Sequence, residues 1–187
     1  RKAVKKERQQ AVANISEIKI LTGQQIKETH WDAFYTFYLE TTSKKWGTPY
    51  LNREFFSLIS QNMEEEIALI LALRDDRPIA AALNFKGKDT LYGRYWGAVE
   101  HHPSLHFELC YYQAIEFAIQ AGLKTVEAGA QGAHKIARGY EPIRTYSAHW
   151  FLDEGFRSAV KHYLEMERED VEHQIRHLSR FTPFKKS

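Results

Sequence analysis

The spacing of apolar and polar positions changes along the first half of the chain. Residues 15–21 alternate apolar and polar side chains as a short strand does. Two helices are expected next, the first carrying an aromatic stripe that includes Trp31 and Phe34, the second capped by Asn52. Three apolar runs joined by polar turns then predict an antiparallel meander: 67–73, 79–85 and 91–99.

The second half of the pattern predicts a helix that crosses between strands. A helix that is apolar almost all round should begin at Pro103-Ser104 and end at Gly122, buried against a sheet. Residues 124–128 and 144–152 are predicted to be short strands, and Asp153 should cap a long terminal helix. These elements predict an α/β domain with a mixed, mostly antiparallel sheet flanked by helices.

Composition supports one globular domain of this kind. The chain has 187 residues, of which 43% are hydrophobic. Its single cysteine, Cys110, excludes a disulfide within the chain and favours a reducing, cytoplasmic location. No apolar run approaches the about 20 residues that a membrane span needs. Because the chain does not begin with Met, we expect it to be part of a longer protein.

Charge is nearly balanced, at +2, but basic residues gather at the start of the chain. We expect residues 1–14 to form a basic linker helix and residues 15–187 to form the α/β domain. The basic run is typical of a solvated helix, and the alternative is contact with a phosphate-rich partner, such as a tRNA acceptor stem or a cell-wall precursor.

Four segments carry a resemblance to a known family: 91–97 (LYGRYWG), 105–115 (LHFELCYYQAI), 127–142 (EAGAQGAHKIARGYEP) and 145–150 (TYSAHW). They resemble bacterial FemAB-like predicted N-acyltransferases, often labelled peptidoglycan biosynthesis/recognition. The resemblance implies a GNAT-like (acyl-CoA N-acyltransferase) fold. It also implies that this chain corresponds to a C-terminal half, with a GNAT-like domain before it.

The same resemblance implies transfer of an acyl or aminoacyl group to a small-molecule or peptide amine, such as that of a peptidoglycan-type precursor. Two donors stay open, aminoacyl-tRNA and acyl-CoA. Ordinary GNAT domains hold the CoA pyrophosphate on a glycine-containing loop at a helix start. Here residues 98–106 contain no glycine, and Glu100 and Glu108 would repel a pyrophosphate. The sequence therefore favours a Fem-like aminoacyl donor, or a site that the other half of the protein completes.

Two other functions remain open. The chain is alternatively a non-catalytic binding module for a cell-wall peptide or tRNA, or a conventional acetyl-CoA-dependent N-acetyltransferase. No metal site is expected, because His101 and His102 are adjacent and have no cysteine partners.

Acyl transfer to an amine needs a base, donors for an oxyanion and groups that orient the substrates. Glu127 ends a predicted strand before small residues, and His134 titrates near neutral pH, so these two are the candidate bases. The segment 127–142 also resembles leucyl/phenylalanyl-tRNA–protein transferases, which implies that Glu127, Gln131, His134 and Gly139 fill the corresponding positions.

The candidate substrate-binding residues are mostly cations and aromatic residues. Lys135 and Arg138 suit phosphate or carboxylate groups. Arg94 lies on a strand predicted to be buried, so we expect a carboxylate partner for it, either Glu108 or Glu127. The full set of predicted substrate-binding residues is Arg94, Tyr95, Glu108, Gln131, Lys135 and Arg138.

Overall fold

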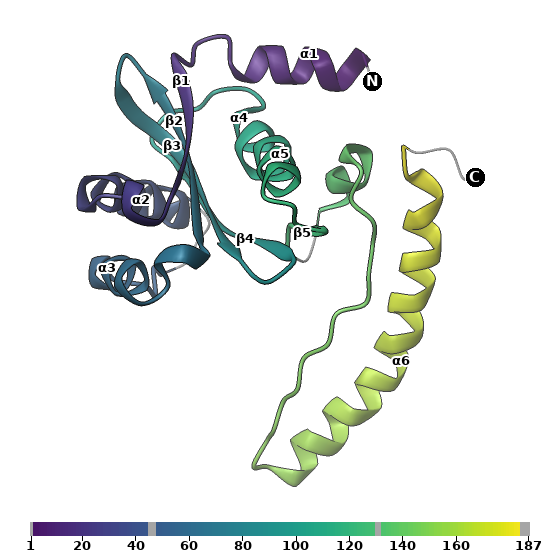
Figure 1. The fold of residues 1–187 in the computed structure, drawn as a ribbon. Coiled ribbons are helices and arrows are strands. Elements are labelled where there is room, and N and C mark those ends of the chain that lie inside the picture. The colour runs from purple at the N-terminus through teal and green to yellow at the C-terminus, as the bar shows by residue number, and fades with distance from the viewer. Residues whose placement is uncertain (1, 45–47, 130–131, 184–187) are drawn as a thin grey trace. The chain divides into compact units, whose positions relative to one another are not determined.

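The computed structural model describes residues 2–44, 48–129 and 132–183. The chain divides into two compact units, residues 1–130 and residues 131–187. The first unit contains the sheet and the helices that cover it (Figure 1). The described part of the second contains a long helix and two short 3-10 segments.

The sheet of the first unit has five strands in sequential order: β1 (Glu17–Thr22), β2 (Ile67–Arg74), β3 (Arg77–Lys86), β4 (Thr90–Ala98) and β5 (Thr125–Glu127). The first four are antiparallel to their neighbours, and β5 runs parallel to β4. The predicted meander and the mixed, mostly antiparallel sheet are therefore confirmed.

Helices cover both faces of this sheet. Figure 1 shows α2 (Glu28–Ser43) and α3 (Arg53–Asn62) on one face. On the other face lies one continuous helical stretch that contains α4 (Leu105–Phe107), a π-helical turn (Glu108–Tyr112) and α5 (Gln113–Gln120). Helix α1 (Lys2–Ala11) belongs to the same unit and buries Ala11.

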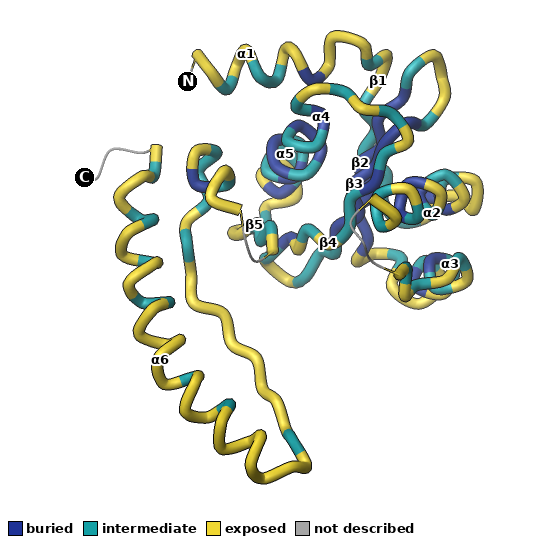
Figure 2. Tube along the Cα trace, turned by 180° about the vertical axis from the view of Figure 1, so that it is seen from behind, coloured by how far each residue is buried: buried dark blue, intermediate teal, exposed yellow. Residues whose placement is uncertain are grey.

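Strand β2 divides the core in two. Its side chains alternate between faces, so that Leu69 and Leu71 pack with the residues of α2 and α3. Ala68 and Ile70 pack with Leu109 and other residues of the opposite helices. Figure 2 shows the result, with buried residues concentrated along the sheet and on the helix sides that face it.

Local signals in the sequence account for several element boundaries. Asn52 caps α3 by accepting a hydrogen bond from the Phe55 backbone N–H at 2.9 Å, as predicted. Asp153 caps the long helix α6 (Glu154–Leu178) through the Phe156 N–H at 2.6 Å. Helix α2 begins only at Glu28, because Thr22 and Gln25 close a separate 3-10 turn first.

The strand predicted at 144–152 is wrong. In the second unit these residues form no strand, and most of their large side chains are exposed, with Trp150 at 74% and Leu152 at 81%. An alternating pattern predicts a strand only when a neighbouring strand satisfies its backbone groups, and none pairs with this segment among the described residues.

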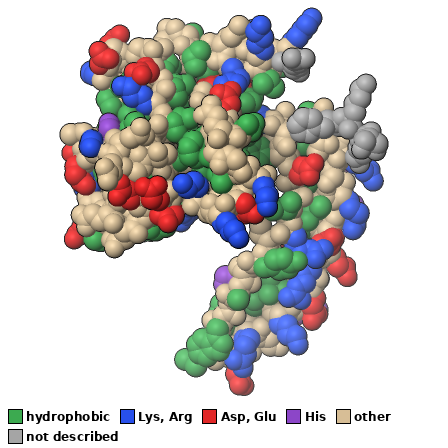
Figure 3. All heavy atoms as spheres, viewed as in Figure 1, with side chains coloured by type: hydrophobic (Ala, Val, Ile, Leu, Met, Phe, Trp, Pro, Cys, Tyr) green, Lys and Arg blue, Asp and Glu red, His purple; other side chains and the backbone are tan. Residues whose placement is uncertain are grey.

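The second unit also contains a 3-10 helix, η4 (Ala133–Arg138), and a final 3-10 turn (Ser179–Phe181). No residue of α6 is buried, although the sequence predicts an apolar face. Figure 3 shows apolar side chains among basic and acidic ones on the surface of this unit. Of the helices that the structure describes, none has both the length and the apolar character that crossing a bilayer requires.

Candidate functional site

The candidate site is built around an irregularity in β4. Tyr95 pairs with Leu83 of β3, and Gly93 pairs with Asn84, so Arg94 is an extra residue without a partner on β3. Such a bulge interrupts the ladder of hydrogen bonds and re-aims side chains. Arg94 and Tyr95, which are adjacent in sequence, contact each other through a cation–π interaction.

A cavity of about 510 Å³ opens beside this bulge on the side of α2. Most of the side chains that line it carry hydroxyl groups. Among the described lining residues Arg94 brings a positive charge, and none is an aspartate or a glutamate. The lining residues are Tyr38, Thr41, Thr42, Thr48, Tyr50, Arg94, Tyr95, Trp96 and His106.

Arg94 is exposed and is held by aromatic residues. Its guanidinium carbon lies 4.4 Å from the centre of the Tyr95 ring, and Nη2 donates to the Tyr50 hydroxyl at 3.2 Å. The expected ion pair with Glu108 or Glu127 is not found among the described residues. Because the side chain reaches solvent and is not buried, it needs no carboxylate partner.

Hydrogen bonds of three tyrosine hydroxyl groups hold one side of the larger cavity together. The Tyr38 hydroxyl accepts hydrogen bonds from the backbone N–H groups of Tyr50 (3.2 Å) and Leu51 (3.4 Å). The Tyr50 hydroxyl in turn contacts the Tyr95 hydroxyl. Burial and, next, the hydrogen bond with Tyr50 raise the pKa of Tyr95 to about 12. Tyr95 therefore stays a neutral phenol near neutral pH.

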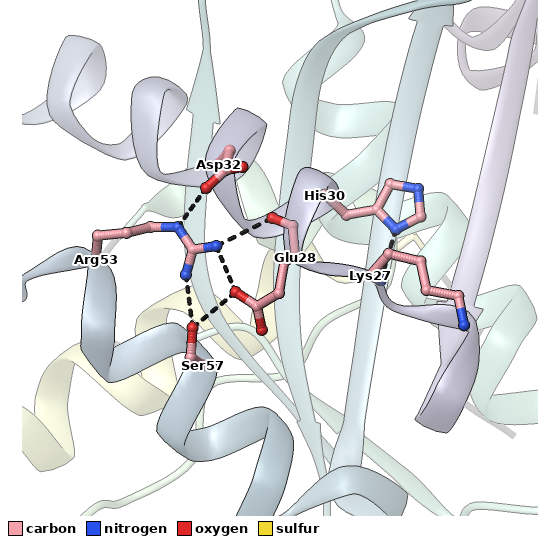
Figure 4. A network of polar contacts seen from close by, with 6 residues as sticks. All are labelled: Lys27, Glu28, His30, Asp32, Arg53 and Ser57. Atoms are coloured by element: carbon pink, nitrogen blue, oxygen red, sulfur yellow. Dashed lines mark hydrogen bonds and ion pairs between the residues drawn. The ribbon is translucent and has the colours of Figure 1, made fainter.

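An ion-pair cluster ties α2 to α3 and so anchors the connection that contains Tyr50. Arg53, the first residue of α3, donates from Nε to Asp32 at 2.8 Å and from Nη2 to the Glu28 carboxylate at 2.6 Å (Figure 4). Its Nη1 also donates to the Ser57 hydroxyl at 2.9 Å. The hydrogen bond from Arg53 lowers the pKa of Glu28.

His30 lies near this cluster and is also drawn in Figure 4. Its Nδ1 accepts a hydrogen bond from the Lys27 backbone N–H at 3.0 Å, which closes the start of α2. Burial, followed by the charges of Lys19 and Lys27, lowers the pKa of His30. The lowered pKa favours the neutral ring, whose Nδ1 can accept this hydrogen bond. His30 therefore serves as a cap at the start of α2.

A smaller cavity of about 110 Å³ adjoins the bulge, between the sheet and the π-helical turn. It shares four lining residues with the larger cavity, which are Arg94, Tyr95, Trp96 and His106. The rest of its lining comes from β3, Gly93, the π-helical turn and the end of β5: Ala82, Leu83, Asn84, Gly93, Cys110, Tyr111 and Ala128. The two cavities thus meet at the bulge.

Asn84 gives the smaller cavity a buried polar group. Its side chain is 1% exposed, and Nδ2 donates to the carbonyl oxygens of Ala68 and Ala82, both at 3.3 Å. These two acceptors fix which end of the amide is nitrogen, because a flipped amide would place Oδ1 against two carbonyl oxygens. Among the described residues, no donor reaches Oδ1.

Gly93 keeps the space beside Asn84 open. A Cβ at this position would lie 3.3 Å from the Glu127 carbonyl oxygen and 3.6 Å from Asn84 Oδ1. A larger side chain would therefore push β4 away from β5 or fill the smaller cavity.

Glu127 lies at the point where β4 and β5 separate. It is the last residue of β5 and pairs with Tyr92. Glu127 itself lines neither cavity, whereas the next residue, Ala128, lines the smaller one.

Glu108 has a partner in the interior of the first unit. It is 1% exposed, and its carboxylate accepts hydrogen bonds from Arg8 Nε (3.0 Å), Arg8 Nη2 (2.8 Å) and Gln113 (2.8 Å). These bonds with Glu108 raise the pKa of Arg8. Glu108 lines neither cavity, and its ion pair with Arg8 joins the helical stretch to α1.

Glu100 is also paired, with one guanidinium and one imidazole. Its carboxylate contacts Arg74 at 2.8 Å and His102 at 2.9 Å, and the hydrogen bond with His102 lowers its pKa. The negative charges of Glu100 and Glu108 are thus partly offset. Their repulsion of a pyrophosphate is weaker than the sequence alone suggests.

The remaining predicted residues belong to the second unit. His134, Lys135 and Arg138 share the 3-10 helix η4, and Arg138 donates to the His134 carbonyl oxygen at 2.7 Å. Burial, then the charges of Arg138 and Lys135, lower the pKa of His134. Gln131 lies outside the described residues.

Sequence reasoning missed several residues that line the cavities, notably Tyr50, Asn84 and His106. Asn84 could have been recognised from the sequence, since it is the polar residue within the apolar run 79–85. Tyr50 follows the Gly47-Thr48-Pro49 break and carried no such signal. Among the described residues, no group of three or more His, Cys, Asp or Glu side chains is placed to hold a metal ion.

Comparison with known proteins gives both a family and a fold. A family model named FemAB-like, described as peptidoglycan biosynthesis/recognition, matches residues 1–186. No curated protein matches the chain significantly.

Solved acetyltransferases share the fold. One is an aminoglycoside acetyltransferase from an uncultured soil metagenomic sample, in complex with sisomicin. It is 13% identical, with a TM-score of 0.52 over 76% of this chain and 98% of that one. A probable acetyltransferase is 14% identical, with a TM-score of 0.53 over 74% of this chain and 99% of that one. These likenesses confirm the GNAT-like fold.

Proposed function

Because this chain belongs to the FemAB-like family and has the GNAT-like fold, we propose that it transfers an acyl group to an amine at the bulge of β4. The observation that carries the proposal is the meeting of two cavities at Arg94, one lined by hydroxyl groups and one containing a buried amide. Two substrates that enter from different cavities would be brought into contact there.

The backbone of the bulge supplies a way to stabilise the transition state. Arg94 has no partner residue on β3, so the ladder is interrupted at this residue. A backbone N–H held in a rigid sheet can donate to the oxyanion that forms when an amine attacks an acyl carbonyl. Donors fixed in this way need no rearrangement during the reaction.

We assign the larger cavity to the acceptor. Its hydroxyl groups suit a polar molecule, and Arg94 suits an anionic group close to the reacting amine. An amine of a peptidoglycan-type precursor with a nearby carboxylate satisfies both conditions. A polycation such as sisomicin, the ligand of the aminoglycoside acetyltransferase, would meet the positive charge of Arg94, and no carboxylate among the described lining residues would offset it.

We assign the smaller cavity to the acyl group of the donor. Asn84 Oδ1 borders this cavity and accepts no hydrogen bond from the described residues, so a ligand that brings an N–H would gain a hydrogen bond there. The α-amino group of an aminoacyl donor provides one, whereas an acetyl group does not. Asn84 therefore favours aminoacyl transfer, with aminoacyl-tRNA as the donor, over acetyl transfer.

Other parts of the sequence interpretation remain predictions. They are Glu127 or His134 as the base, and Gln131, Lys135 and Arg138 as ligands of substrate anions or of tRNA. An additional N-terminal GNAT-like domain likewise remains a prediction.

A labelled-donor assay tests the proposed function. The chain is incubated with [14C]alanyl-tRNA or [14C]acetyl-CoA and a peptide that has one lysine amine and a free carboxyl terminus. We expect label on the peptide from alanyl-tRNA. We also expect Asn84→Leu to lower that transfer about tenfold or more, the value of one hydrogen bond to a charged group. Asn62→Leu, whose native amide donates within α3, is the matched control.

Each alternative function has its own outcome in this assay. Transfer from acetyl-CoA alone would identify a conventional acetyltransferase. Binding of the peptide without transfer from either donor would identify a binding module. Either result would contradict the proposal.

A further inference from the structure

We propose that His106 is the general base of this acyl transfer. It would take a proton from the acceptor amine and return that proton to the leaving group. The inference rests on the proposed function and adds to it a residue that the sequence did not assign.

The position of His106 carries the inference. It belongs to α4 and lines both cavities, so it borders the place where the amine and the acyl carbon would meet. Its ring contacts the rings of Trp96 (5.3 Å between centres), Phe107 (5.5 Å) and Tyr111 (5.5 Å) edge-on. Aromatic packing on several sides limits the orientations of the imidazole, as a catalytic base requires.

The chemistry of the shared residues singles out His106. Of the four that line both cavities, Arg94 carries a guanidinium, which donates hydrogen bonds and accepts none, and Trp96 has no basic nitrogen. The raised pKa of Tyr95 keeps its hydroxyl from acting as a base near neutral pH. An imidazole changes its charge in the physiological range, so the histidine is the member of this set able to accept a proton there.

Other titratable groups also border the two cavities. They are Tyr38 and Tyr50 across the larger cavity, and Cys110 and Tyr111 from the π-helical turn. None of the described lining residues of either cavity is an aspartate or a glutamate. A carboxylate base would have to reach in from outside, as Glu127 would.

The proposed step balances in atoms and charge. The imidazole of His106 takes one proton from the acceptor amine, and the nitrogen lone pair forms a bond to the acyl carbon. The bond from that carbon to the leaving oxygen of an aminoacyl ester then breaks. The imidazolium gives its proton to that oxygen, so an amide and an alcohol are released and His106 is neutral again.

Substitution of His106 tests the inference in the same assay with alanyl-tRNA and the lysine peptide. We expect His106→Gln to lower kcat/KM about 10²- to 10⁴-fold, the usual contribution of general acid–base catalysis. The melting temperature should be nearly unchanged. His101→Gln, an exposed histidine that lines neither cavity, should keep wild-type activity.

Two further readouts separate a base from a structural residue. The wild-type rate should fall at acidic pH, because a protonated imidazole cannot act as a base, and His106→Gln should lose that dependence. Added imidazole should restore part of the activity of His106→Ala, because a free imidazole can occupy the vacated space and accept the proton.

The outcomes distinguish this inference from the proposed function. If the wild-type chain transfers alanine and His106→Gln does so equally well, the inference is wrong while the function stands. The inference is also wrong, and the function still stands, if Glu127→Gln abolishes the reaction and its pH dependence while His106→Gln does not. If the wild-type chain transfers nothing, the proposed function is contradicted and the inference falls with it.

Discussion

The guanidinium of Arg94 is positioned by its neighbours in a way that suits an anionic ligand. Its guanidinium stacks on Tyr95 and donates to Tyr50, and such a cation–π contact at an exposed site contributes only about 0.5–1 kcal/mol. A bidentate bond to a carboxylate is stronger than either contact. The side chain is therefore held in place by Tyr50 and Tyr95, and it has no carboxylate partner within the described part of the chain.

Substitution of Arg94 should reveal this preference. We expect Arg94→Gln to raise KM about 10- to 100-fold for a lysine peptide with a free carboxyl terminus, since a hydrogen bond to a charged group contributes about 1.5–3 kcal/mol. KM for the C-terminally amidated peptide should change little. The measurement is steady-state kinetics with both peptides, and Arg77→Gln, at the exposed start of β3, is the control. An equal loss with both peptides would argue against a bond to the carboxylate.

At the residue scale, the sequence marked Arg94 and Tyr95 but not their neighbours in the cavity. Polar residues within an apolar run stand out in any sequence, as Arg94 does. Tyr38 belongs to the aromatic stripe of α2 and looks like a core residue, and indeed its ring is buried. Only the fold shows that its hydroxyl reaches the backbone of Tyr50.

At the scale of elements, the site depends on how β4, α2 and α3 are held. A Cβ at Gly97 would lie 2.4 Å from backbone atoms of Phe37, so α2 packs directly on β4 at this glycine. The ion pairs of Arg53 then fix α3 relative to α2. The side of the larger cavity that contains Tyr50 is thus held by the packing of α2 on β4 and by the ion pairs between α2 and α3.

The Arg53 cluster should stabilise the fold in a pH-dependent way. The pKa of Glu28 is lowered in the folded state, so its contribution is present above its ordinary pKa and is lost as pH falls through the lowered value. We expect Arg53→Met to lower Tm by about 2–4 °C at pH 7, as a loss of about 1 kcal/mol would. The difference from wild type should shrink below about pH 4.

Thermal melts at pH 7 and pH 3 check this expectation. Lys44→Met, which removes an exposed pair with Glu40, is the control and should change Tm by less. If the effect of Arg53→Met is the same at both pH values, packing of the Arg53 stem rather than its charge would be responsible.

Element prediction succeeded where a signal was local. The three apolar runs became β2, β3 and β4, and the caps at Asn52 and Asp153 formed as predicted. The prediction failed at 144–152, where alternation was present but no strand lay beside it. The bulge at Arg94 could not be predicted from the sequence either, because strand register depends on the partner strand.

At the scale of the whole molecule, the first unit is one body that includes the basic helix α1. The Arg8 guanidinium neutralises the buried Glu108 carboxylate, and leaving such a charge unpaired would cost several kcal/mol. The resemblance of the sequence to the FemAB-like family is confirmed over residues 1–186. The meeting of two cavities at the bulge required the folded structure, because its parts come from β3, β4, α2, α4 and the π-helical turn.

The central claim is that acyl transfer takes place where these two cavities meet. A crystal structure of the chain with Nε-alanyl-lysine, the product of alanine transfer to a lysine amine, tests it most directly. We predict the new amide at the bulge, with its carbonyl oxygen about 3 Å from the Arg94 backbone N–H. The alanine amino group should face Asn84 Oδ1, and the lysine carboxylate should face the Arg94 side chain. Ordered binding of this product outside both cavities would contradict the account.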